Sequence, residues 1–182
     1  MKDFIMVVLL GVGTFITLFG QKENYGSNPA VKEYEINYNR RIKEESLNGI
    51  YIPADVQEAL DIIIESSDSS GLFRLKRVSE EMAANGLRKR LGKWILVRWG
   101  FEEGSRLSHH IKMKYGVSHP EDMSEFIVRA LYRKVNQKPL DLDQIATFMI
   151  KRRADARAER MKKAKTEVLY KRKVSPDQHQ NK

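Results

Sequence analysis

The sequence predicts an all-α protein of about six helices with a projecting basic C-terminal helix, and three observations lead to this prediction. Beyond residue 50, apolar residues recur at a spacing of three or four, which is typical of one face of a helix. Glycines and capping residues separate these periodic segments. No stretch of useful length alternates apolar and polar residues as a half-buried strand does, and no internal repeat occurs.

Length and composition narrow the class of protein. The 182 residues suit one domain of ordinary size, with 41% hydrophobic and 31% charged residues. That balance is too apolar for a disordered chain and too polar for a protein that crosses the membrane many times. The absence of cysteine excludes a disulfide scaffold, a thiol nucleophile and an iron–sulfur cluster.

The first residues have the character of an export signal. Phe4 to Phe19 is a run of sixteen uncharged residues, preceded by Lys2 and followed by Gly20 and a polar stretch. A bilayer-spanning helix needs about 20 apolar residues, so this length better suits the apolar core of a cleaved signal peptide over residues 1–20. Export to the periplasm or cell envelope is the prediction. An uncleaved membrane anchor formed by residues 4–19 and a buried core helix are the alternatives.

The mature chain then divides into three parts. Residues 21–49 are polar and are expected to be flexible or partly helical, with a moderately helical stretch over 31–47. Residues 50–150 hold the periodic segments and form the expected helical domain. Residues 151–182 form the expected basic tail, which continues the last helix.

Prolines, glycines and capping residues set the expected helix ends within 50–150. One helix is expected to start at Pro53 and Asp55 and to stop in the serine-rich 66–71, and another to cover 73–85 and break at Gly86. The next face carries Leu91, Ile95 and Trp99. The remaining starts are expected at N-cap Ser105, at His119-Pro120 and at the capping-box pair Asp141 and Gln144, and the first of these helices is expected to close at Gly116.

The cationic character lies almost wholly in the tail. The formal net charge is +9, yet residues 151–182 alone carry twelve basic and four acidic residues. The body is therefore near neutral. The tail residues expected to act electrostatically are Lys151, Arg152, Arg153, Arg157, Arg160, Lys162, Lys163 and Lys165. A solvated helix, an anionic membrane surface and nucleic-acid phosphates are the interpretations of this tail.

Several short motifs in the middle of the chain occur together. They are Tyr51-Ile52-Pro53-x-Asp55, Gly92-x-Trp94-Ile95, Arg98-Trp99-Gly100, Ser105-x-Leu107 and His119-Pro120-x-Asp122-Met123-Ser124. With them, roughly residues 50–150 resemble a bacterial domain family of unknown function. The resemblance implies a small helical fold and a domain boundary near each end, and it carries no catalytic residue.

Two constellations are candidates for function. Trp94 and Trp99 lie five residues apart, about 140° around a helix, so one ring can be core while the other joins Arg98 and Arg106 in a contact surface. Packing of both rings in the core is the alternative. His119 and Asp122 complete the candidate binding residues, although a helix start at Pro120 explains them more simply.

Catalysis is the weaker interpretation. A pocket near Trp99, Arg106, His109 and His119 would be needed, and no recognised nucleophile, phosphate or dinucleotide motif is present. Adjacent His109 and His110 cannot share one helix face, so a metal site with His119 and Asp122 is not expected, nor is any other cofactor. The acid pairs Glu80-Glu81 and Glu102-Glu103 are expected to be solvated. The predicted function is non-enzymatic binding of an unknown protein or an anionic membrane surface in the cell envelope, with nucleic acid an alternative if the signal is misinterpreted.

Overall fold

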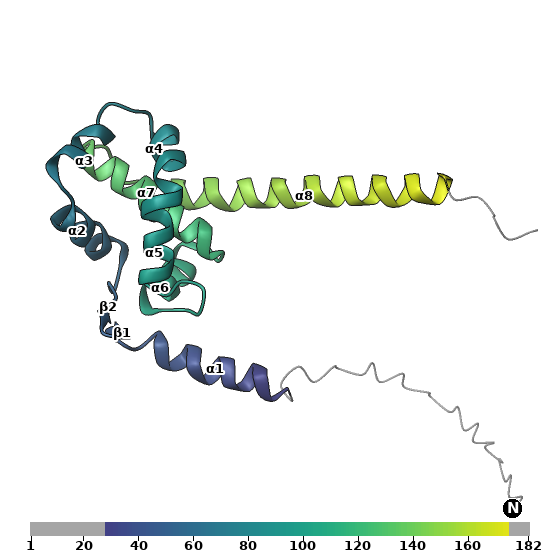
Figure 1. The fold of residues 1–182 in the computed structure, drawn as a ribbon, viewed down its shortest axis with the longest axis horizontal. Helices are drawn as coiled ribbons and strands as arrows, with labels where there is room; N and C mark the ends of the chain where they lie inside the picture. The colour runs from purple at the N-terminus through teal and green to yellow at the C-terminus, as the bar shows by residue number, and fades with distance from the viewer. Residues whose placement is uncertain (1–27, 175–182) are drawn as a thin grey trace, which may run out of the picture.

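The computed structural model describes residues 28–174, with side chains up to residue 168, and it confirms an all-α fold (Figure 1). A helical body carries a long helix that projects from one side, and a shorter helix lies below it at the N-terminal end (Figure 1). The expected signal peptide over 1–20 lies outside the described residues. In chain order, the elements are α1 Pro29–Arg41, β1 Ser46–Leu47, β2 Ile50–Tyr51, α2 Val56–Ser66, α3 Ser69–Leu75, α4 Glu80–Leu87, the π-helix η2 Arg88–Gly92, α5 Lys93–Arg98, α6 Arg106–Tyr115, α7 Pro120–Val135 and α8 Leu142–Val174.

The N-terminal helix is shorter than expected. A helix was predicted over 31–47, but α1 ends at Arg41 and the chain then forms a two-residue antiparallel hairpin, β1 with β2. Asn48 and Gly49 both have positive φ, at 51° and 75°. Two consecutive positive φ values are the geometry of the tight hairpin turn that Asn-Gly favours. The turn chemistry therefore prevails over the helical tendency of the preceding residues.

The predicted stop of the preceding helix in the serine-rich segment is confirmed, because α2 ends at Ser66, whereas the helix predicted after it and its break at Gly86 differ from expectation. A single helix was predicted over 73–85, but α3 ends at Leu75 and α4 starts after Ser79, whose hydroxyl accepts a hydrogen bond from the Met82 N–H. Gly86 does not stop the chain, because α4 continues through it into η2 and α5. Tertiary packing of α4 and η2 against α7 outweighs the cost of about 1 kcal/mol that glycine imposes inside a helix.

The later helix boundaries are confirmed. Ser105 caps α6 in a capping box with Ser108, and Gly116 ends that helix in the left-handed conformation at φ 73°. Pro120 is the first residue of α7 with His119 at the N-cap position, although the His119 side chain makes no capping hydrogen bond. The last helix starts directly after Asp141, as expected, and runs without interruption into the basic tail.

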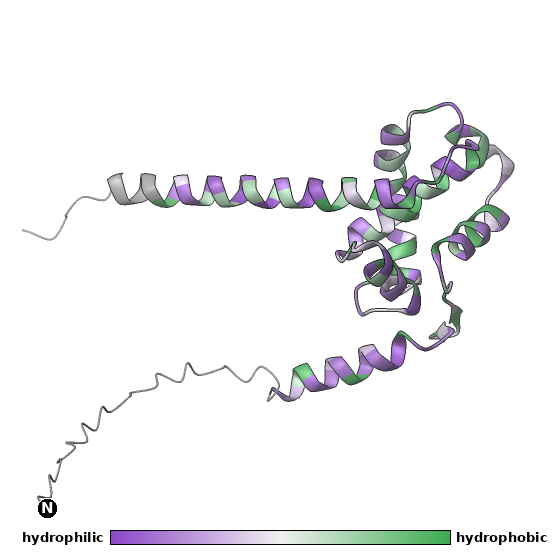
Figure 2. Cartoon of the chain, turned by 180° about the vertical axis from the view of Figure 1, so that it is seen from behind, coloured by the Kyte–Doolittle hydropathy of each residue, from purple (hydrophilic) through white to green (hydrophobic). Residues whose placement is uncertain are grey.

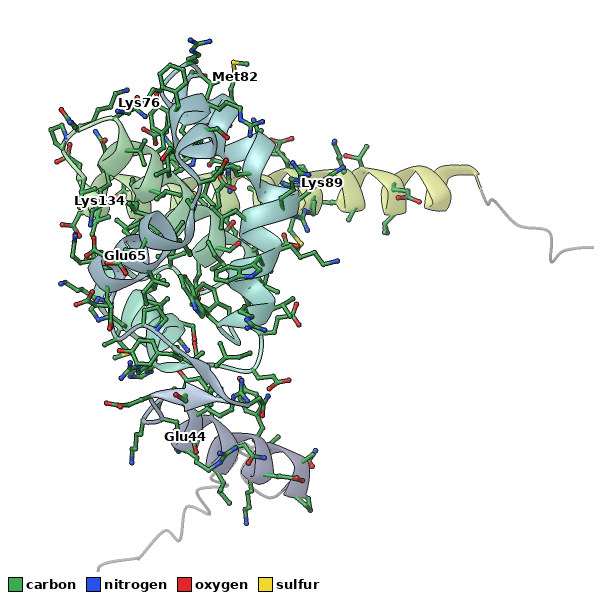
Figure 3. All side chains as sticks on the ribbon, turned by 60° about the vertical axis from the view of Figure 1, so that its left-hand side comes forward. Glu44, Glu65, Lys76, Met82, Lys89 and Lys134 are labelled. Carbon is green, nitrogen blue, oxygen red and sulfur yellow. The ribbon has the colours of Figure 1, made fainter. Side chains whose placement is uncertain are left out.

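Helix α7 is the centre of the body. It packs against α2, α3, α4, η2, α5, α6 and α8, and all eleven residues over 122–132 are buried. Apolar side chains from the surrounding helices complete the core, including Leu60, Ile95, Trp99, Ile111 and Met149. Side chains fill the space between these helices, whereas α8 extends away from the body after its first turns (Figure 3). No helix within residues 28–174 combines the length and the apolar character needed to cross a bilayer.

Candidate functional site

Because other helices surround α7, several of its charged residues lie inside the body. Asp122, Glu125 and Arg129 are 7%, 6% and 4% exposed. Their spacing of three and four places them along one side of the helix, where α8 approaches. Buried charges are stable only when they are paired and hydrogen-bonded, so their partners define the geometry of this region.

Glu125 is the centre of the resulting ion network. Its Oε1 accepts a hydrogen bond from Arg129 Nε at 2.9 Å, within α7. Arg152 of α8 donates to both carboxylate oxygens, from Nη1 at 2.7 Å and from Nη2 at 2.8 Å. This bidentate geometry is the strongest form of arginine–carboxylate pairing. Arg129 in turn donates to Glu81 of α4 at 2.6 Å, so the network joins α4, α7 and α8.

A second carboxylate extends the network along α8. Asp122 accepts from Arg152 Nη2 at 3.3 Å and also accepts from Arg153 Nε. Arg152 and Arg153 therefore tie the base of α8 to α7 and do not reach outward as tail cations. Asp122, predicted as part of a contact surface, is buried among these arginines. Of the acid pair expected to be solvated, Glu81 is 58% exposed as well as bonded to Arg129, whereas Glu80 is largely buried against Arg129 and Arg133.

The pKa of each central group reflects this pairing. Burial alone raises the pKa of Glu125, but the hydrogen bonds from Arg152 and Arg129 outweigh it and leave the pKa below its ordinary value. Burial lowers the pKa of Arg129, and its bonds to Glu81 and Glu125 outweigh that effect in the opposite direction. The Phe148 ring lies 4.7 Å from the Arg129 guanidinium carbon and 5.6 Å from that of Arg152, in cation–π contact with both. The hydrogen bond to Glu125 likewise raises the pKa of Arg152. Glu125, Arg129 and Arg152 are thus held in their charged forms.

The other tail cations are exposed. Lys151, Arg157, Arg160, Lys163 and Lys165 contact no acidic group among the residues that the structure describes. Lys162 pairs with Glu159 one turn earlier, at 3.2 Å. We call the part of α8 beyond Arg153 the arm. Along the arm, short hydrophilic and hydrophobic bands alternate (Figure 2).

The two tryptophans differ in environment. Trp99 is 1% exposed and belongs to the core, so it cannot form part of a contact surface. Trp94 is 42% exposed and meets Trp99 edge to face, with ring centroids 5.4 Å apart. Arg98 is exposed at the end of the same helix. Of the predicted tryptophan–arginine surface, the structure leaves Trp94 and Arg98 accessible.

The residues of the alternative catalytic pocket have separate partners. Arg106 Nε donates to the Ile52 carbonyl at 2.6 Å, at the N-terminal end of α6. His109 Nδ1 lies 2.9 Å from the Tyr38 hydroxyl of α1. His119 lies beyond the other end of α6, and Trp99 is in the core. Within the described residues, no group of three or more potential metal ligands is arranged to hold an ion.

Two of these residues nevertheless carry an unsatisfied atom. Arg106 Nη2 and His119 Nδ1 are buried without a hydrogen-bond partner among the described residues. Arg106 also packs over the Tyr51 ring at 4.9 Å, and its Nη1 is 3.6 Å from Glu45. These contacts make Arg106 a clamp between α6 and the β hairpin. His119 instead lines a groove beside α8.

That groove lies where the arm leaves the body. It has a volume of about 690 Å³ and is formed by the turn between α6 and α7 together with α8. Val117 and His119 line it from the turn, and Ile150, Ala154, Arg157 and Met161 line it from α8. A second hollow of about 300 Å³ lies beside it, where Arg88 of η2 faces Arg152 and Arg153. Sequence reasoning missed both, because they depend on how α8 is mounted.

Comparison with known proteins gives one finding. Residues 52–135 match the family model of DUF6794, a domain of unknown function. The match begins just after β2 and ends with the last residue of α7. This confirms the expected resemblance to a domain family of unknown function, and the matched segment does not include α8. No curated protein and no solved structure matches the chain.

Proposed function

We propose that this protein is a non-enzymatic binding module that engages an acidic partner protein through the arm. The observation that carries the proposal is the mounting of α8, whose base is tied to α7 by Arg152 and Arg153 through Asp122 and Glu125. A helix of 33 residues extends about 50 Å. A helix of this length, fixed at its base and solvated beyond it, presents a set of charges in a defined position.

The placement of charge on the arm favours a protein partner over a lipid surface. Residues 154–174 carry eight basic and three acidic residues, a net of +5, and the three acids lie among the cations of 154–168. An anionic membrane attracts each Lys or Arg near its surface by about 1 kcal/mol, but it offers no arrangement that spares the acids on the same helix. A folded acidic partner can instead place carboxylates opposite single cations such as Arg157 and Arg160 and away from Asp155 and Glu159. Binding to anionic lipid is the competing outcome of the test.

The positions of the histidines and of Arg106 also favour binding over catalysis. An acid–base site requires groups within hydrogen-bond reach of one reacting atom. His109 and Arg106 are engaged with α1 and with the β hairpin, respectively, while His119 lies beyond the opposite end of α6. The groups proposed for a catalytic pocket are thus distributed over the body.

Export to the cell envelope is the second part of the proposal, and the apolar run from Phe4 to Phe19 supports it. An exported protein does not meet chromosomal DNA, which leaves an envelope protein as the acidic partner. The intact mass of the protein recovered from fractionated native-host cells tests this part. We expect a species that begins near Gln21 in the envelope fraction, and a full-length soluble species would overturn it.

Truncation of the arm tests the binding function. Removing residues 151–182 would also remove Arg152 and Arg153, which would leave Asp122 buried without a partner and Glu125 with Arg129 alone. A chain that ends at Ala156 keeps both arginines, so the body should remain folded, as circular dichroism can verify. We expect the full chain to bind fluorescent poly-L-glutamate and the truncated chain not to bind it.

Three results would contradict this proposal. Equal binding by the two chains would show that the arm is not the site. Binding to phosphatidylglycerol vesicles without binding to poly-L-glutamate would assign the arm to lipid. Binding that does not weaken as salt is added would show that charge is not the cause, because exposed charges are screened over about 8 Å at physiological ionic strength.

A further inference from the structure

The groove at the base of the arm continues along α8 as a narrow apolar stripe. Ile150, Ala154, Arg157, Met161, Ala164 and Val168 follow one another at intervals of four, three, four, three and four residues. We call this row the seam. An alternation of four and three gives an average period of 3.5 residues, which is the spacing of a coiled-coil contact face. Its apolar members are exposed: Ile150, Met161 and Val168 are 47%, 66% and 55% accessible.

The seam and the groove lie on the same side of α8. Four of the six seam residues, namely Ile150, Ala154, Arg157 and Met161, line the groove opposite Val117. The core residues Ile145 and Met149 face the body from a neighbouring side of the helix. A ligand seated in the groove can therefore continue along the arm without leaving the apolar stripe.

The flanks of the seam are cationic. Lys151 and Lys165 lie along one edge and Arg160 along the other, at the helix positions that neighbour a coiled-coil seam. The acidic residues Asp155 and Glu159 lie about 140° and 180° around the helix from the seam, calculated at 100° per residue. Glu167 lies one heptad beyond Arg160, on the same flank at the end of the seam. Between residues 150 and 165 the flanks therefore carry cations and no acid, and Asp155 and Glu159 lie away from the apolar stripe.

This placement of charge determines which kind of partner can bind along the groove and the seam. In a parallel pair of two copies joined seam to seam, Arg160 of each copy would lie against Lys165 of the other, and such like-charge juxtaposition is unfavourable. A partner helix with an apolar stripe and acidic flanks would form opposite-charge pairs at both edges. An apolar groove that receives one face of an amphipathic helix is a recurring mode of recognition.

We propose that the groove and the seam bind an acidic amphipathic α-helix of a partner protein, one with small or aliphatic residues along one stripe and glutamate or aspartate on both sides of it. The proposal rests on the function proposed above and names the partner's chemistry. From Ile150 to Val168 the seam spans about 27 Å, so the bound segment has about five turns.

A designed helical peptide tests the proposal directly. The probe is a fluorescent peptide of about 21 residues with leucine and alanine at the seam-facing heptad positions and glutamate on both flanks. A control peptide of the same composition has its order scrambled so that no apolar stripe forms. We expect the full chain to bind the amphipathic peptide at least about tenfold more tightly than the scrambled one, measured by fluorescence anisotropy.

A pair of charge reversals on the arm locates the site. Arg157→Glu changes the seam itself, whereas Lys163→Glu makes the same change of charge on the opposite side of the same exposed helix. Long-range attraction is reduced similarly in both, so only direct contact separates them. We expect Arg157→Glu to weaken binding of the amphipathic peptide at least about tenfold, and Lys163→Glu to weaken it by less than about threefold. Circular dichroism of each variant verifies that the helices are retained.

The outcomes separate this inference from the function on which it rests. Equal binding of the amphipathic and scrambled peptides, or equal losses in the two variants, would overturn the helix-docking site while the cationic arm still binds poly-L-glutamate. Failure to bind poly-L-glutamate and both peptides would overturn both proposals. Self-association in sedimentation equilibrium that Met161→Glu abolishes would show that a second copy occupies the seam, and this too would overturn the inference.

Discussion

Replacing Glu125 with glutamine should show how strongly the ion network holds α8 to the body. Glutamine keeps the size and one carbonyl acceptor of the side chain, but it removes the negative charge that Arg129 and Arg152 share. Three hydrogen bonds of 2.7–2.9 Å end on this carboxylate. Glu125→Gln therefore leaves two arginines with less compensation and changes the shape of the core very little.

The size of the expected loss in stability follows from the interactions that each arginine keeps in the variant. Removing one partner of a fully buried ion pair costs about 3–5 kcal/mol. Arg129 retains Glu81 at 2.6 Å, and the side chain of Arg152 is 38% exposed and can be hydrated. The expected loss in the free energy of unfolding is therefore smaller, about 2–3 kcal/mol. Urea denaturation followed by tryptophan fluorescence measures it, because Trp99 lies in the core.

Glu81→Gln is the matched control. Glu81 bonds to the same Arg129, but its side chain is 58% exposed, and pairs of this kind contribute about 0–1 kcal/mol. A loss for Glu81→Gln as large as that for Glu125→Gln would refute the argument that burial determines the cost. So would a change of less than about 0.5 kcal/mol for Glu125→Gln, which would show that the network is neutral.

The pH dependence gives the prediction a second test. Because the folded pKa of Glu125 is lowered, the carboxylate stabilises the fold at pH values above its ordinary pKa of about 4.3. That contribution is lost as the pH falls through the lowered folded pKa. The difference in stability between the natural chain and Glu125→Gln should therefore be constant near neutral pH and shrink in acid. A difference that persists unchanged in acid would contradict the assignment.

The remaining predictions concern the body and use the same urea assay. Trp99→Ala should lower the free energy of unfolding by about 3–5 kcal/mol, because the ring is 1% exposed. Trp94 is 42% exposed, so Trp94→Ala should lower it by about 1 kcal/mol through loss of the edge contact with Trp99. Equal losses would contradict the assignment of Trp99 to the core. Ser105→Ala should cost about 1 kcal/mol, because it removes the hydroxyl that caps α6 and accepts from the Ser108 N–H. Full stability of that variant would show that the capping box does not hold this helix.

Local rules predicted much of the fold because several helix ends depend on residues within one turn. The Ser105 cap, the Gly116 termination and the proline start of α7 are all determined by side chains next to the helix end. The incorrect predictions concern segments whose secondary structure is determined by tertiary packing or by turn geometry. Gly86 continues a helix because α4 packs on α7, and Asn48 with Gly49 forms a hairpin turn too short to carry a periodic signal.

The candidate site was less predictable, since it consists of contacts between distant residues. Glu125 and Arg129 are a recognisable pair four apart, and Arg152 and Arg153 are visible as basic residues. Their connection across 27 residues depends on the antiparallel return of α8 along α7, for which the sequence has no local signal. The charge count assigned Arg152 and Arg153 to a free tail, because a composition cannot distinguish a cation with a buried partner from one in water.

The network and the proposed docking face are two consequences of a single helix. Arg152 and Arg153 hold one side of α8 to the body, while Ile150 and Ala154, on either side of them in the sequence, line the groove on another. Because a helix transmits its rotation along its axis, fixing the two arginines also fixes the direction in which the seam faces. A tail attached by a flexible linker would have to lose that orientational freedom on binding, at a cost in affinity. Glu125, which is buried within α7 and does not line the groove, can thus contribute to recognition by fixing the helix that presents the docking face.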